Sequence, residues 1–138
     1  MELILEKYKP NQRDTWSWHM AKIPDVPEIV WMAQDQFGSE VDTVFKTDPW
    51  CYSKNVTLAV VEQSYDTHKC QLIVARNKLD SSLMAYSWLT RNHYMPYAHD
   101  ECAEAAFAHI DLKLPLRTRI TLMAQILQQW ILWCQKIG

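Results

Sequence analysis

Two apolar runs of strand length, residues 70–76 and 83–90, are separated only by the polar sequence of residues 77–82. A loop this short suits a hairpin of two antiparallel strands, because parallel strands need a crossover of roughly a dozen residues or more. Helix-type apolar patterns stand before and after this pair, at residues 26–37 and 118–136. The chain is therefore expected to form an α/β domain in which helices pack on a sheet.

Further strand patterns lie near both ends of the hairpin. Residues 2–8 and 16–23 stand on either side of the turn sequence Lys9-Pro10-Asn11, which predicts two more strands at the start of the chain. Residues 104–112 predict another strand after the hairpin. The expected sheet is mixed but mainly antiparallel, flanked by helices, with an extra N-terminal strand.

Three helices are expected from capping signals and apolar spacing. The first begins at Asp25, with Pro27 in its first turn, and Gly38 should end it. Residues 55–65 favour a second helix, although their β-branched residues also suit a strand, and the mixed residues 39–53 suggest a short helix and a break. The stripe of the first helix that should cover the sheet consists of Val26, Ile29, Val30, Ala33 and Phe37.

The third helix, residues 118–136, carries a longer apolar stripe, and Gly138 is available to end it. Gln125, Gln128 and Gln129 interrupt its apolar stretch, which is too polar to cross a bilayer about 30 Å thick. We expect the stripe to face the sheet. It consists of Ile120, Met123, Leu127, Trp130, Ile131 and Cys134.

Length and composition favour a single domain, residues 1–138. Fourteen basic and sixteen acidic residues give a formal charge of −2, so no global field would attract nucleic acid or an anionic membrane. The four cysteines form no C-x-x-C pair, and the N-terminus has no signal-peptide pattern. A soluble, cytoplasmic protein with reduced thiols is therefore expected. Seven tryptophans are the one unusual excess.

The order strand, helix, helix, strand, strand, strand, long helix resembles that of the GNAT (GCN5-related N-acetyltransferase) family. Locally, residues 23–30 (IPDVPEIV) are similar to the family's entry into its first helix. Residues 106–135 are similar to its fourth strand, turn and third helix. The resemblance covers residues 16–138 and implies a GNAT-like fold.

The family's turn before the third helix carries R/Q-x-x-G-x-G/A, because the pyrophosphate of the coenzyme contacts bare backbone N–H groups at a helix N-terminus. Alignment of the apolar pairs in the helix places Thr118 at the Arg/Gln position and Thr121 and Met123 at the two small-residue positions. Gly38 and Gly138 are the only glycines in the chain, so no register restores the loop. We therefore expect no cofactor, with acetyl-CoA as the alternative.

The resemblance also implies where catalytic groups would lie. The family's later strands complete the acceptor cleft and would fall beyond Gly138, so another chain or the extra N-terminal strands would have to replace that wall. If acetyl transfer occurs, Glu104 is the candidate general base, and the alternative is a solvated carboxylate at a strand end. The backbone of Ala108 and Ile110 would pair with the pantetheine arm, or would simply form a sheet edge.

Arg117 and Arg119 flank the turn before the third helix. Guanidinium groups match the geometry of phosphate, so the pair could bind an anionic ligand even without glycines, although the alternative is ordinary surface charge. Cations are disfavoured at a helix N-terminus by the helix dipole. This conflict points to an anionic partner, such as the carboxylates of another subunit.

Two other clusters lack the partners that a complete site needs. The first offers atoms of metal-ligand type, but a His-x-x-Cys pair is only half of a zinc site, so no metal is expected. In the second, His109 and Asp111 have no serine or cysteine of nucleophile type beside them, so a core or edge pair is expected instead. The first cluster comprises His93, His99, Asp100 and Cys102.

Trp31 lies away from the stripe of the first helix, and Trp133 lies off the stripe of the last. Surface aromatic residues are favoured at protein interfaces, so both are candidate interface residues. We expect a non-catalytic GNAT-like structural or interaction subunit, bound to protein partners or to its own copies, in an assembly such as a virus particle or accessory complex. The alternatives are an acetyl-CoA-dependent N-acetyltransferase and a module that binds an anionic ligand at Arg117 and Arg119.

Overall fold

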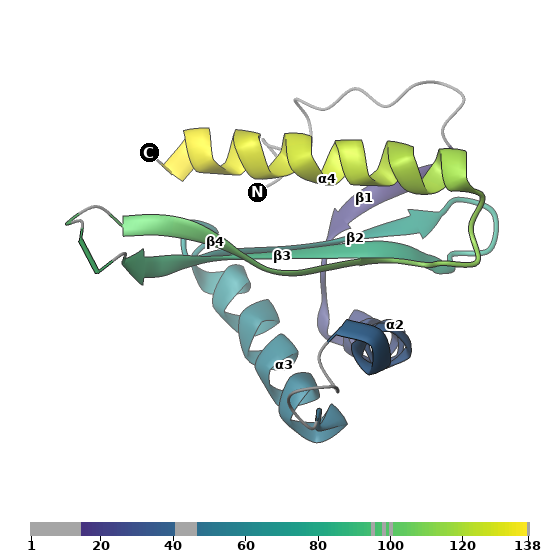
Figure 1. Cartoon of the computed structure of the whole chain (residues 1–138), viewed down its shortest axis with the longest axis horizontal. Coiled ribbons are helices and arrows are strands. Elements are labelled where there is room, and N and C mark those ends of the chain that lie inside the picture. Colours follow the sequence, from purple (N-terminus) through teal and green to yellow (C-terminus); the bar gives the residue numbers. More distant parts are fainter. Residues whose placement is uncertain (1–14, 41–46, 95, 98, 100, 138) are drawn as a thin grey trace.

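A computed structural model describes residues 15–40, 47–94, 96–97, 99 and 101–137 of the chain. One antiparallel sheet forms the middle layer, with α4 on one face and α2 and α3 on the other (Figure 1). The sheet therefore has two separate apolar cores, one against α2 and α3 and one against α4.

The sheet contains four described strands in the order β1-β2-β3-β4, and each neighbouring pair is antiparallel. The expected α/β fold with a mainly antiparallel sheet is confirmed. The predicted strand at residues 2–8 lies outside the described residues. The bounds of the four strands are β1 (Trp16–Met20), β2 (Cys70–Asn77), β3 (Leu83–Tyr94) and β4 (Glu101–Ile110).

A 3-10 turn, η1 (Ile23–Asp25), leads into α2 (Val26–Glu40). The carboxylate of Asp25 accepts a bond from the backbone N–H of Lys22 at 2.7 Å and pairs with Arg76 of β2 at 2.5 Å. The prediction that Gly38 ends the helix is wrong, because α2 continues to Glu40. A glycine inside a helix costs only about 1 kcal/mol, which neighbouring turns can offset.

The helix predicted at residues 55–65 is confirmed and begins earlier, since α3 spans Pro49–Tyr65. Asp48 caps it by accepting the backbone N–H of Trp50 at 2.9 Å, and Pro49 occupies a first-turn position where no N–H is needed. Val56, Ala59 and Val60 are buried on the side of this helix that packs on the sheet.

The last helix, α4 (Leu116–Ile137), turns a different side to the sheet from the one predicted. Its buried side chains are Leu122, Gln125, Ile126, Gln129 and Trp133. From the predicted stripe, Trp130 is half-buried and Cys134 is exposed. The other four are also exposed, with exposed fractions of 61% for Ile120, 39% for Met123, 47% for Leu127 and 60% for Ile131.

Indole N–H groups explain this rotation of α4. Trp16 and Trp18 of β1 both donate to Oε1 of Gln125, at 2.8 and 2.6 Å. Trp130 donates to Oγ of Ser87 on β3, and Trp133 donates to the backbone carbonyl of Thr67 at 2.9 Å. A buried polar group without a partner is costly, so these bonds favour a helix orientation that places a glutamine, rather than the apolar stripe, on the sheet.

Cys70 is buried at the start of β2, where its thiol donates to the backbone carbonyl of Ala59 at 3.3 Å. Burial, with smaller contributions from the carboxylates of Glu62 and Asp66, raises the pKa of this thiol to about 12. Cys51 and Cys134 are exposed, and partial burial raises the pKa of Cys134. Cys70 is therefore an inert core residue rather than a reactive thiol.

The substitution Gln125→Ala should destabilise the fold by about 2–5 kcal/mol, because it removes the acceptor of two buried indole donors. Urea unfolding followed by tryptophan fluorescence measures the change. Gln128→Ala is the matched control, since Gln128 is exposed on the same helix and should change stability by less than about 0.5 kcal/mol. Equal losses from the two variants would contradict the orientation of α4.

The buried thiol of Cys70 should make stability fall as the pH rises between its ordinary pKa of 9.0 and about 12. In that range the unfolded thiol loses its proton while the folded one keeps it, so unfolding is favoured by up to about 1.4 kcal/mol per pH unit. Unfolding curves at pH 8 and pH 10, as round test values, should therefore differ less in Cys70→Ala than in the unsubstituted chain. Parallel losses in both proteins would argue against a buried thiol.

Candidate functional site

In a GNAT-like enzyme, the backbone N–H groups of the turn between β4 and α4 would have to hold the pyrophosphate. In this chain, acceptor atoms within the turn already bond two of those N–H groups. The carboxylate of Asp111 accepts the backbone N–H of Lys113 at 3.0 Å. The carbonyl of Asp111 accepts the N–H of Leu114 at 3.2 Å. Leu114 also packs into the α4 core. The turn thus presents a carboxylate and bulky side chains where an anion would need bare N–H groups.

The first turn of α4 begins two residues earlier than predicted, at Leu116. Thr118 is therefore the third helical residue, while Thr121 and Met123 are the sixth and eighth. Only the first few N–H groups of a helix lack an intrahelical partner, so those of Thr121 and Met123 are committed to the helix. The hydroxyl of Thr121 bonds back to the carbonyl of Arg117 at 3.0 Å.

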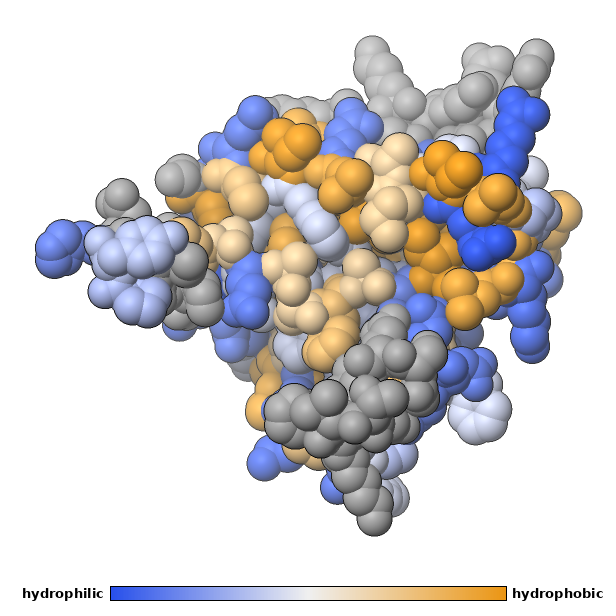
Figure 2. Space-filling view, in the orientation of Figure 1, coloured by the Kyte–Doolittle hydropathy of each residue, from blue (hydrophilic) through white to orange (hydrophobic). Residues whose placement is uncertain are grey.

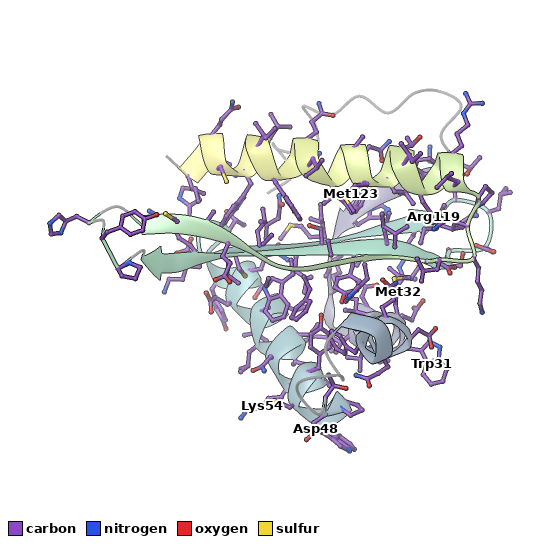
Figure 3. All side chains as sticks on the ribbon, in the orientation of Figure 1. Trp31, Met32, Asp48, Lys54, Arg119 and Met123 are labelled. Atoms are coloured by element: carbon purple, nitrogen blue, oxygen red, sulfur yellow. The ribbon has the colours of Figure 1, made fainter. Side chains whose placement is uncertain are left out.

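Arg117 and Arg119 both lie in this first turn, but their surroundings differ. Arg117 is exposed. Arg119 is half-buried, and its Nε donates to the carbonyl of Leu114 at 3.1 Å, which closes the turn before the helix (Figure 3). Among the described residues, neither arginine forms a salt bridge. The N-terminal end of α4 therefore carries two unneutralised positive charges together with the positive end of the helix dipole.

The residues predicted on the fourth strand lie along β4, the strand at one edge of the described sheet. Glu104 is exposed and is the fourth residue of the strand rather than the first. Ala108 is half-buried and Ile110 is buried. The carbonyl of Ile110 accepts a bond from the side-chain amide of Gln36 on α2 at 2.9 Å, so α2 already occupies part of the backbone that would pair with pantetheine.

His109 belongs to a buried chain of hydrogen bonds on the α2 and α3 side of the sheet. Its Nδ1 lies 2.5 Å from the hydroxyl of Tyr86, which lies 2.7 Å from the hydroxyl of Tyr52. Phe37 and Phe107 pack around the ring of His109. The surroundings of His109 are those of a satisfied core residue, but the expected pair with Asp111 is not formed, because Asp111 lies beyond β4 in the turn before α4 and bonds to Lys113.

The cluster of His93, His99, Asp100 and Cys102, where no metal was expected, is only partly covered by the described residues. Asp100 and the side chain of His93 lie outside the described part of the chain, while His99 is exposed and Cys102 is half-buried. Elsewhere in the described ranges, no three His, Cys, Asp or Glu side chains group in a way that could hold a metal ion.

The two tryptophans predicted at an interface differ in their exposure. Trp31 is 74% exposed and projects from α2 away from the sheet (Figure 3). It borders an open groove of about 380 Å³ between α2 and the turn before α4. The expectation that Trp133 lies at the surface is wrong, because it is fully buried. It lies opposite the apolar stripe of α4, and that opposite side is the one that packs on the sheet.

An exposed apolar stripe on α4, which we call the outer face, is the feature that sequence reasoning placed on the wrong side. Figure 2 shows apolar residues gathered in the upper part of the molecule, where α4 lies. The stripe itself is visible in the sequence, but its direction is not, because apolar spacing would place Gln125 and Gln129 on the outside of the helix. The outer face consists of Leu116, Ile120, Met123, Leu127 and Ile131.

In the described ranges, no helix is long and apolar enough to span a membrane, and α4 is no exception. An exposed apolar face on a surface helix is typical of a contact with another macromolecule.

No protein-family model and no curated protein matches the sequence. Among solved structures, the chain is similar to a "possible acetyltransferase" from Clostridium difficile 630. The likeness has a TM-score of 0.59 at 11% sequence identity and covers 83% of this chain and 70% of that protein. At this identity it shows a shared fold, and the chain therefore has an acetyltransferase-like α/β fold.

Proposed function

We propose that this chain is a non-catalytic domain with a GNAT-like fold that acts as an interaction subunit of a larger assembly. The observation that carries the proposal is the outer face of α4, where five large apolar side chains on one helix are exposed. Leaving such a surface in water forgoes roughly 25 cal/mol for each Å² that a partner could cover. A partner seated on the helix would recover that free energy.

The turn before α4 supports the non-catalytic part of the proposal. Its Lys113 and Leu114 amides are bonded to Asp111, and the Asp111 carboxylate adds a negative charge. A coenzyme pyrophosphate would have to break these bonds and approach a like charge. Arg117 supplies a positive charge, but the turn beside it does not offer the free backbone N–H groups that bind phosphate at helix N-termini.

The edge of β4 supports the same proposal. Gln36 of α2 donates to the Ile110 carbonyl, which leaves less of this backbone for an extended ligand arm. Glu104, the candidate general base, is exposed on this strand. An N-acetyltransferase with a non-standard loop is the second candidate, favoured only by the likeness of fold to the possible acetyltransferase.

Calorimetric titration of the full chain with acetyl-CoA should show no saturable binding up to a ligand concentration of about 1 mM, which corresponds to less than about 4 kcal/mol of binding free energy. The physical reason is the occupied turn at Asp111. Heat that saturates at micromolar ligand, and that disappears in the double variant Arg117→Ala/Arg119→Ala, would contradict the proposal and favour the acetyltransferase.

A further inference from the structure

The outer face of α4 has the shape of a helix-docking surface. Its five residues follow one another at intervals of four, three, four and four positions, which keeps them on one side of the helix. From Leu116 to Ile131 the stripe is about 22 Å long at 1.5 Å per residue. A second helix of about four turns would match that length, and helix-on-helix contacts use this spacing of apolar anchors.

The outer face also lies on the side of α4 nearer the open edge of β4. Gln125 is held by β1, while Trp130 bonds to Ser87 on β3, so the Trp130 side of the helix faces β3 and β4. Met123 precedes Trp130 by seven residues, almost two full turns, and therefore lies on that same side. A helix seated on the outer face would lie on the side of α4 away from the sheet, displaced toward β4.

The charged side chains of α4 itself all have one sign. The described length of α4 contains Arg117, Arg119 and Lys136 and no aspartate or glutamate. Both arginines lie at its N-terminal end, where the helix dipole is also positive. Since neither forms a salt bridge among the described residues, a partner with carboxylates at this end would neutralise them.

A second copy of this chain would fit these charges poorly. In an antiparallel pair of α4 helices docked through their outer faces, no aspartate or glutamate of either helix would lie against the arginine end of the other. In a parallel pair, Arg117 would lie beside its own copy. Neither arrangement supplies a carboxylate from the helix, and like charges brought together disfavour association.

We propose that the outer face of α4 binds an amphipathic helix of another protein, with apolar anchors on one side and acidic residues flanking the anchors near the Arg117 end. This inference rests on the proposed function, because it identifies the kind of partner through which an interaction subunit would act. Apolar contact supplies the binding surface, and the acidic flanks select the partner and its direction on α4.

Two synthetic helical peptides of equal length test the proposal against the full chain. Both carry leucines at intervals of three and four residues, and they differ only in flanking residues, glutamate in one and lysine in the other. Fluorescence anisotropy of the labelled peptides at about 150 mM salt should give a Kd for the acidic peptide at least tenfold lower than for the basic one. The double variant Arg117→Gln/Arg119→Gln should reduce that ratio below about threefold, because it removes the selecting charges.

A variant in the apolar face supplies the second arm. Leu127→Glu should abolish binding of the acidic peptide, whereas Gln128→Glu, the matched control on the polar side of α4, should change its Kd by less than about threefold. Both positions are exposed, so circular dichroism should show the same helix content in both variants and in the unsubstituted chain.

Three outcomes would overturn the inference. The first is equal or absent binding of the two peptides. The second is a chain that sediments as a dimer and becomes monomeric in Leu127→Glu, because the occupant is then a second copy. The third is peptide binding that is absent in the unsubstituted chain and appears only in the double variant Leu3→Asp/Leu5→Asp, which removes two apolar residues of the N-terminal segment. The occupant of the outer face would then be the chain's own N-terminal segment. Acetyl-CoA binding overturns the proposed function instead, so the two failures are distinguishable.

Discussion

The hydrogen bonds of four indole groups fix how α4 sits on the sheet, and the surface of the molecule depends on that orientation. Two indoles from β1 converge on the single side-chain oxygen of Gln125, and Trp130 and Trp133 donate back to β3 and to the loop before β2. Each bond ties a buried or half-buried indole to a distant part of the chain. Together they hold the helix at one rotation about its axis.

That rotation has a cost on the inner side and a consequence on the outer side. Gln129 is fully buried on the inner side, and among the described residues neither its side-chain nitrogen nor its oxygen finds a hydrogen-bond partner. The packing of Leu122, Ile126 and Trp133, with the indole bonds, outweighs this unsatisfied amide. The most regular apolar stripe of the chain is consequently directed at the surroundings instead of the core, which is why we assign α4 to a partner.

Much of the fold could be predicted from the sequence, because most elements obey simple patterns. The hairpin of β2 and β3 follows from two apolar runs around a short polar loop, and Val26 to Phe37 of α2 bury the stripe that their spacing indicated. Gly38 was misleading, since a glycine is compatible with a helix that neighbouring turns support. Boundaries such as the start of α4 depended on local capping bonds that apolar spacing does not report.

The candidate site could be predicted less well, for a physical reason that concerns α4. Apolar spacing ranks side chains by hydrophobicity, and on that measure the face with Gln125 and Gln129 should point outward. Indole groups are large and apolar but carry one donor each, so they bury best beside an acceptor. Trp16 and Trp18 face Gln125 across 109 and 107 positions in the sequence, a pairing that only the folded chain displays.

Hydroxyl-radical footprinting with mass spectrometry tests the orientation of α4 most directly, because it reports the exposure of individual side chains in the folded chain. Leu127 and Ile131 should be oxidised several-fold faster than Leu122 and Ile126, which have the same chemistry on the same helix. The reverse order, with Leu122 and Ile126 modified first, would place the apolar stripe on the sheet. It would thereby remove the surface to which we assign the function of the chain.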